Sequence, residues 1–219
     1  MTKRVAVILA GCGVFDGSEI YETTLTLLRL DQLGIEYRCF APDIEQHHVI
    51  DHRTQEVSEG EVRNVLTESA RLARGDVSAL DELSADDFDA VFVPGGFGVA
   101  KNLSDFAEAG AEASVFEPLK TALAGFLTEG KPIGMMCIAP ALVPRLLGEG
   151  IAVTVGNDPG VSGAISAMGG LHRSCGVDDI VVDLEHRVVT TPAYMLATRL
   201  SEAATGIFKL VDRVDEMMA

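Results

Sequence analysis

The chain has 219 residues, of which 47% are hydrophobic and 23% charged, and its formal net charge is −16 at pH 7. This length suits one three-layer hydrophobic core and is short for two, so we expect a single domain over residues 1–219. The negative charge and the lack of a Lys/Arg-rich cluster argue against a nucleic-acid partner, because phosphate backbones bind clustered cations.

Membrane and secretory segments are not predicted. No apolar run reaches the roughly 20 residues that cross a bilayer, and the first residues lack the basic stretch and apolar core of a secretory signal. We therefore expect a cytoplasmic protein without membrane association. The cysteines Cys12, Cys39, Cys137 and Cys175 form no C-x-x-C pair, so reduced thiols are expected rather than disulfides or structural zinc.

Hydrophobic runs and helical periodicities alternate along the first half of the chain. The predicted elements are a buried strand at 4–10, a helix at 18–33 ended by Gly34, a strand at 36–41, a polar excursion or hairpin at 43–60, a helix at 61–73 and a buried strand at 89–93. Pro94-Gly95-Gly96 ends that last strand, and a loop through Asn102 is expected after it.

The same alternation continues to the end of the sequence. The predicted elements are a helix at 115–129, a strand at 132–136, a helical segment at 139–147, short strands at 152–155, 180–183 and 188–191, and a closing helix at 196–214. Strands that alternate with helices predict an α/β fold with a mostly parallel sheet and helices on both faces. Ligands of such sheets bind at the carboxyl ends of the strands.

Cys137 is the leading candidate for a nucleophile. It follows a predicted buried strand and precedes small residues and a helix, which is the arrangement of a nucleophile elbow. A thiol at a helix start faces unpaired N–H groups that favour the thiolate, so a lowered thiol pKa is expected. The alternative is a small hydrophobic residue of the core. Cys12 also follows a strand and is interpreted as a residue lining the site.

Two glycines and a backbone amide form a candidate oxyanion hole. Gly95 and Gly96 follow the third strand, and glycine lets backbone N–H groups approach a bound oxyanion. The N–H of Ile138 completes the set, and Asn102 at the end of the same loop is a candidate substrate-binding residue. The alternative for the Pro-Gly-Gly tripeptide is an ordinary turn.

Two carboxylates begin the first predicted helix. Glu19 and Glu22 are three residues apart and lie on one face near the same strand end. Asp16 followed by Glu19 indicates a capping box, which favours a structural role for Glu19. Glu22 lacks that explanation and is a candidate general acid/base that stays protonated beside the thiol. Its alternative is a solvated glutamate on the helix face.

The histidines do not form a metal-binding pattern. His47, His48 and His52 lie close in sequence, but adjacent residues rarely face one ion, so a solvated loop is the interpretation and no metal or cofactor is predicted. Whether His52 or His172 enters the site is left open by the sequence.

Four segments together resemble the ElbB-like glyoxalases, a family of the PfpI-type, class I glutamine amidotransferase-like superfamily. They are VILAGCGVFDGSE at 7–19, VPGGFGVAKNL at 93–103, GMMCIAPA at 134–141 and VTTPAYM at 189–195. The resemblance spans nearly the whole chain and implies a flavodoxin-like three-layer sandwich. It also implies that Glu22 contacts the Cys137 nucleophile and that Gly95 or Gly96 and Ile138 donate to the oxyanion.

The implied activity is that of a glutathione-independent, cofactor-free glyoxalase, a lyase of the hydro-lyase type. Glyoxal or methylglyoxal would become the hydroxy acid through a cysteine hemithioacetal, with a deglycase activity sometimes proposed and a homodimer usual. The chain departs from the superfamily in carrying Ile138 in place of a peptidase histidine, Ala139 in place of an amidotransferase glycine, and no His-x-Glu pair. A metabolite-binding or thiol-sensing protein and a partner-dependent amidotransferase-like subunit stay open as alternatives.

Overall fold

Seven strands form one twisted sheet at the centre of the computed structural model, which describes residues 2–218. The strands are β1 (Arg4–Ile8), β2 (Glu36–Ala41), β5 (Val77–Ala79), β6 (Ala90–Val93), β7 (Ile133–Met136), β10 (Val181–Asp183) and β11 (Val188–Thr191), in the spatial order β10-β11-β7-β6-β1-β2-β5. Every neighbouring pair is parallel except β10 with β11. The α/β prediction is therefore confirmed.

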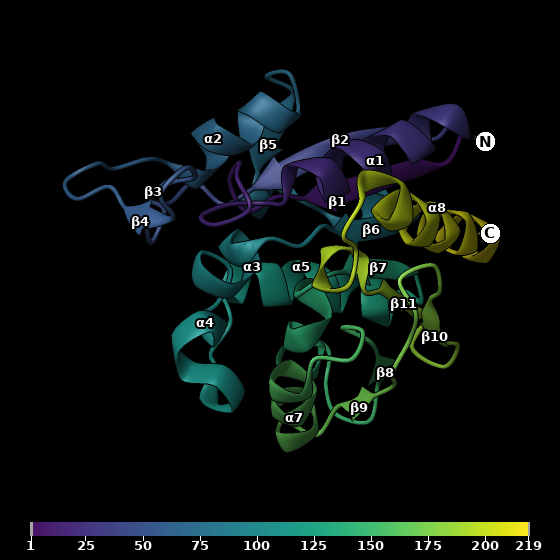
Figure 1. The fold of residues 1–219 in the computed structure, drawn as a ribbon. Helices are drawn as coiled ribbons and strands as arrows, with labels where there is room; N and C mark the ends of the chain where they lie inside the picture. Colours follow the sequence, from purple (N-terminus) through teal and green to yellow (C-terminus); the bar gives the residue numbers. More distant parts are fainter. Residues whose placement is uncertain (1, 219) are drawn as a thin grey trace.

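Alternate residues of the central strands face two separate hydrophobic cores, as the two-residue period of a strand requires. On β1, Val5 and Val7 pack with helices α1 (Ile20–Gln32) and α8 (Leu200–Met217), whereas Ala6 lies in the core under α5 (Glu117–Thr128). Figure 1 shows α1 and α8 together on one side of the sheet and α5 on the other. The result is the three-layer sandwich that the sequence predicted.

The remaining elements lie outside the seven-stranded sheet. They are the hairpin β3 (Ile50–Asp51) and β4 (Glu56–Val57), helices α2 (Val65–Leu72), α3 (Phe97–Lys101), α4 (Phe106–Ala109), α6 (Val143–Leu146) and α7 (Pro159–Ala167), the parallel pair β8 (Ala152–Val153) and β9 (Leu171–His172), and the 3-10 turns η1 (Leu80–Glu82), η2 (Ala85–Asp87), η3 (Gly110–Glu112), η4 (Ala139–Leu142) and η5 (Ala193–Met195). The hairpin predicted within 43–60 is confirmed. None of the helices within residues 2–218 has the length and apolar character that a membrane crossing requires.

Several local elements differ from the predictions, including the edge strand β5, which was not predicted. The loop expected through Asn102 contains α3, which begins directly after Gly96. The helical segment expected at 139–147 is confirmed, but it is divided into the 3-10 turn η4 and the short helix α6, because Pro140 and Pro144 lack the N–H that continuous helical hydrogen bonding needs. Helix α7 was not predicted, although its Asp158 N-cap and Pro159 at the first position are ordinary start signals.

Candidate active site

Cys137 occupies a strained turn directly after β7. Its φ is +61°, in the left-handed region that a non-glycine residue adopts only under constraint, and its N–H donates to the Thr191 carbonyl at 3.1 Å. This is the backbone geometry of a nucleophile elbow. The residue is 8% exposed and its side chain lines a cavity, so the sulfur is enclosed but reachable.

Glu22 lies beside that sulfur in the first turn of α1. Its carboxyl group is fully buried: one oxygen accepts the Gly95 N–H at 2.8 Å and the other accepts the Tyr194 N–H at 3.1 Å. Burial, and then the nearby Glu19 carboxylate, raise the pKa of Glu22 to about 7. The alternative of a solvated glutamate is thereby excluded, and the group titrates where a general acid/base is most effective.

Gly95 is the spacer that lets the acid and the thiol meet. A Cβ at this position would lie 2.4 Å from the Cys137 Cβ and 2.8 Å from the Glu22 Oε2 atom. No side chain fits there, so only glycine permits the contact between Glu22 and Cys137. Because the Gly95 N–H is engaged by Glu22, this glycine positions the acid rather than serving as an oxyanion donor.

The two other predicted backbone donors point at the sulfur. The N–H groups of Gly96 and Ile138 hydrogen-bond the Cys137 sulfur. Gly96 has φ +96°, and a Cβ there would lie 2.4 Å from both the Glu19 nitrogen and the Gly17 oxygen, so the position requires glycine. These amides favour negative charge on the sulfur, and they stand where an oxyanion formed by attack on a carbonyl would develop.

The protonation state of Cys137 differs from the expectation. Burial, followed by the adjacent Glu22 carboxylate, raises the pKa of the Cys137 thiol well above its ordinary value, although the Gly96 and Ile138 amides oppose this. The predicted lowered pKa was wrong because the sulfur is enclosed beside an acid and because η4 is a single 3-10 turn, not a long helix. The sulfur therefore needs Glu22 to accept its proton during attack.

Glu19 has a different structural role from the one predicted. Helix α1 begins at Ile20, so Glu19 is itself the N-cap, and its carboxylate accepts the Glu22 N–H at 2.6 Å. Asp16 lies too far before the helix to form a capping box and instead accepts the Ile50 N–H at 2.8 Å. Glu19 also lines the cavity, and burial raises its pKa.

The cavity that opens onto Cys137 has a volume of about 350 Å³. Its lining consists of Val14, Glu19, Gly96, Phe97, Ala100, Phe106, Ala107, Cys137, Ile138, Val161, Tyr194 and Met195. Sequence reasoning missed the role of Tyr194, whose N–H holds Glu22 and whose side chain enters the cavity. The signal for it was its place at the carboxyl end of β11, next to β7 in the sheet.

Four predicted site residues are absent from this lining: Glu22 and Gly95, which pack against the thiol, and Asn102 and Cys12. Asn102 is buried, and its side-chain amide donates to the carbonyls of Ala10 and Asp16 at 2.9 and 3.0 Å, so it ties neighbouring loops together. Cys12 is half-buried, and its pKa is raised by burial and then by Glu68. His52 and His172 are likewise absent from the lining, so its groups that can carry a proton are Cys137, Glu19 and Tyr194, with Glu22 behind the thiol.

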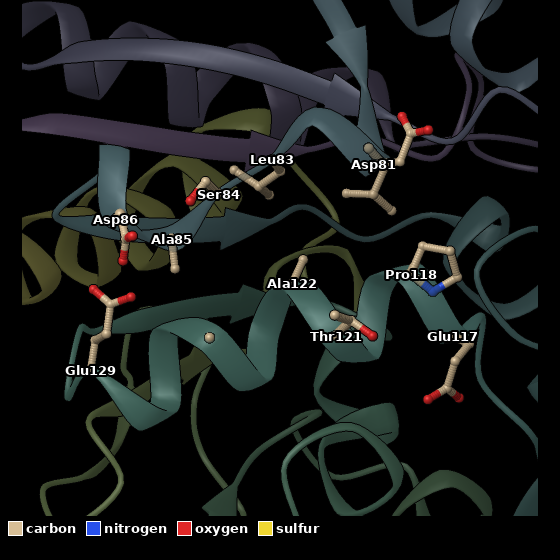
Figure 2. Close-up of a pocket in the computed structure, with 12 residues that line it drawn as sticks. Asp81, Leu83, Ser84, Ala85, Asp86, Glu117, Pro118, Thr121, Ala122 and Glu129 are labelled. Carbon is tan, nitrogen blue, oxygen red and sulfur yellow. The ribbon is translucent and has the colours of Figure 1, made fainter.

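A second cavity of about 600 Å³ lies between the turns η1 and η2 and helix α5 (Figure 2). Its charged residues are Asp81, Asp86, Glu117 and Glu129, and the Asp86 and Glu129 carboxyl groups hydrogen-bond each other. The cavity holds no thiol, so it lacks the nucleophile of the first. Over residues 2–218, no group of three or more His, Cys, Asp and Glu side chains is arranged to hold a metal ion.

Comparisons with known proteins extend over the full length of the chain. It is 47% identical to the human glutamine amidotransferase-like class 1 domain-containing protein 3, mitochondrial, over 98% of this chain and 83% of the relative. It is 45% identical to the ES1 protein homolog, mitochondrial, of Rattus norvegicus, over 98% of this chain and 84% of the relative. No family model matches the sequence.

Solved structures show the same fold. A protein from Ehrlichia chaffeensis described as an isoprenoid biosynthesis protein with an amidotransferase-like domain superposes with a TM-score of 0.92 at 38% identity, with both chains fully covered. Glyoxalase III from Candida albicans superposes with a TM-score of 0.63 at 15% identity, covering 99% of this chain and 98% of that one, which shows the fold alone. The Ehrlichia chaffeensis structure and the human relative support the amidotransferase-like superfamily.

The relatives correct the predicted cellular location. The human and rat proteins, and an ES1 protein of Danio rerio that is 33% identical over 99% of this chain, are all named as mitochondrial. This finding contradicts the cytoplasmic location expected from the sequence. That expectation rested on the absence of a secretory signal, which bears on export from the cell and not on the choice between internal compartments.

Proposed function

This chain belongs to the ES1 family of glutamine amidotransferase-like class 1 domain-containing proteins, and on that premise we propose that it is a cofactor-independent glyoxalase. It would convert glyoxal or methylglyoxal into the corresponding 2-hydroxy acid, as the resemblance to the ElbB-like glyoxalases implies. One observation carries the proposal: the Cys137 thiol lines a cavity and contacts both the buried Glu22 carboxyl group, whose pKa is about 7, and two backbone N–H donors.

The first step is addition of the Cys137 sulfur to the aldehyde carbon. Glu22 accepts the thiol proton as the carbon–sulfur bond forms, and the Gly96 and Ile138 amides stabilise the oxyanion until it is protonated. The hemithioacetal R–CO–CH(OH)–S–Cys137 results. Glu22 is held in place for this proton transfer by the backbone N–H groups of Gly95 and Tyr194.

The second step moves hydrogen between adjacent carbons without an external oxidant. The Glu22 carboxylate removes the proton from C1 of the hemithioacetal, and the electrons pass to the C2 carbonyl. The C1 hydroxyl proton moves to the C2 oxygen, and Glu22 returns its proton to C2, which gives the thioester R–CH(OH)–CO–S–Cys137. Water then cleaves the carbon–sulfur bond, which releases the hydroxy acid and restores the thiol. The sum is R–CO–CHO plus water giving R–CH(OH)–COOH, so no redox cofactor is needed.

Two features of the site favour this reaction over thiol sensing and over an amidotransferase-type reaction. Oxidant sensing depends on a thiolate of low pKa, whereas burial and Glu22 raise the pKa of Cys137. An amidotransferase-type reaction employs a histidine base, and the proton-carrying groups around Cys137 are carboxyl and phenol groups instead. The homodimer implied by the resemblance stays a prediction, which size-exclusion chromatography with light scattering tests.

The test is consumption of methylglyoxal by the purified protein, with the hydroxy acid quantified as the product. Cys137→Ala is expected to abolish turnover and Glu22→Gln to reduce it by about 100-fold or more, which is the usual range for loss of an acid/base group. Cys175→Ala is the matched control, since that thiol lies in a distant loop and should leave the rate unchanged. A folded Cys137→Ala protein with undiminished activity would refute the proposal.

A further inference from the structure

The cavity presents two chemically different regions to a substrate. The reactive groups cluster where Cys137, Gly96, Glu19 and Tyr194 meet through the contacts already described. The rest of the lining is hydrocarbon, supplied by Val14, Phe97, Ala100, Phe106, Ala107, Ile138, Val161 and Met195. These residues come from separate parts of the chain, so the apolar wall is a product of the tertiary fold.

Positive charge is missing from the lining. Neither lysine, arginine nor histidine is among the lining residues that the structure describes. The cation on the nearest helix is Lys101, and its ammonium group donates to the Phe15 carbonyl at 3.2 Å and lies 5.3 Å from the centre of the Phe97 ring. The one carboxyl group among the described lining residues is that of Glu19. An anionic substrate group would therefore be desolvated without a partner, which is costly.

The volume also exceeds what the smallest 2-oxoaldehydes need. A cavity of about 350 Å³ falls within the range that holds drug-sized ligands, whereas glyoxal has four non-hydrogen atoms. With the aldehyde carbon at Cys137, most of the remaining volume borders apolar side chains. An apolar substituent that fills this volume would be removed from water, and that transfer is favourable.

We propose that the site selects uncharged 2-oxoaldehydes that carry an extended apolar substituent, and discriminates against those that carry a carboxylate. The proposal rests on the proposed function, because it names the substrate class of the same site. Specificity is assigned to the apolar wall, with Phe106 and Val161 as its buried and half-buried anchors. Glyoxal and methylglyoxal would then contact only the reactive groups around Cys137 and leave the apolar part of the cavity unfilled.

A matched pair of substrates separates charge from size. The aldehyde 5-methyl-2-oxohexanal ends in an isopropyl group, and 4,5-dioxopentanoate ends in a carboxylate of the same shape on the same chain. We expect kcat/KM for the isopropyl compound to be about tenfold or more above the value for methylglyoxal. It should be about 100-fold or more above the value for the carboxylate compound. Equal values for the pair, or a preference for the carboxylate, would overturn the proposal.

Alkylation tests the same cavity without turnover. Iodoacetamide and iodoacetate differ in charge, and N-hexyl iodoacetamide adds an apolar chain; labelling of Cys137 is followed by mass spectrometry and normalised to a free thiol in solution. The expected order is N-hexyl iodoacetamide, then iodoacetamide, then iodoacetate. If this order holds while no aldehyde is consumed, the ligand class stands and the glyoxalase proposal fails. If iodoacetate labels Cys137 as well as iodoacetamide does, the ligand class fails.

One substitution at the cavity mouth should weaken the discrimination against a carboxylate. Ala107 lies exposed on the short helix α4 and lines the cavity, so a long side chain there can reach inward without disturbing the core. Ala107→Arg should raise kcat/KM for 4,5-dioxopentanoate by about tenfold relative to Ala107→Gln, which adds length without charge. Identical values for the two variants would show that the missing cation does not determine specificity.

Discussion

The buried carboxyl group of Glu22 should make the stability of the protein depend on pH. Its pKa is about 7 in the folded protein against an ordinary value of 4.5, so folding favours the protonated form. The corresponding stability is fully present below about pH 4.5 and is lost as the pH rises through about 7. At about 1.36 kcal/mol per unit, the loss totals about 3.4 kcal/mol, of which about 2 kcal/mol falls between about pH 5.5 and about pH 8.

Urea denaturation of the wild type and of Glu22→Gln at those two pH values measures this loss. The neutral glutamine removes the titration, so the wild type should lose about 2 kcal/mol relative to the variant on going from about pH 5.5 to about pH 8. The comparison cancels the titrating groups that do not interact with Glu22. Glu36→Gln, at a carboxyl group with 65% of its side chain exposed, should behave like the wild type. If the free energy of unfolding changes by the same amount in the wild type and in Glu22→Gln between these pH values, the pKa of Glu22 is not raised.

Three further outcomes follow from single contacts. Gly95→Ala should destabilise the protein by about 1–3 kcal/mol, because the added Cβ overlaps Cys137, and it should abolish turnover. Gly163→Ala should stabilise α7 by about 0.5–1 kcal/mol, because nothing lies within 4 Å of the added Cβ. Urea denaturation measures both changes in stability. Leu210→Ala, in the buried face of α8, should lower the free energy of unfolding by about 2–5 kcal/mol in the same assay. Leu200→Ala, at a position that is 48% exposed, should lower it by less than about 0.5 kcal/mol. Equal losses would contradict the assigned core. The rate of Cys137 alkylation by iodoacetamide should rise only at higher pH than for an ordinary thiol. In Glu22→Gln the rise should begin at lower pH, because that variant lacks the charge that raises the pKa of the thiol. An unchanged pH profile would show that Glu22 does not raise the pKa of the thiol.

The fold could be predicted from the sequence because its signals are local. Arg4 to Ala10 is a continuous apolar run, and its alternate residues supply both cores, which a parallel strand covered on two faces requires. The same kind of signal placed Cys137 directly after a strand and Glu22 at the start of a helix. Parallel strands bring their carboxyl ends to one edge of the sheet, so the order of the elements along the chain was enough to predict that these residues meet.

The chemistry of the site was decided by tertiary packing. The pKa of Cys137 depends on how completely segments distant in sequence enclose the sulfur, and helix-dipole reasoning from neighbouring residues gave the wrong direction. Gly95 and Gly96 are adjacent in sequence, yet one N–H holds Glu22 and the other faces the sulfur, because the chain turns between them. Tyr194 joins the site through its backbone, which no side-chain pattern encodes. Residue identity thus determined which groups are present, and packing determined where their protons reside.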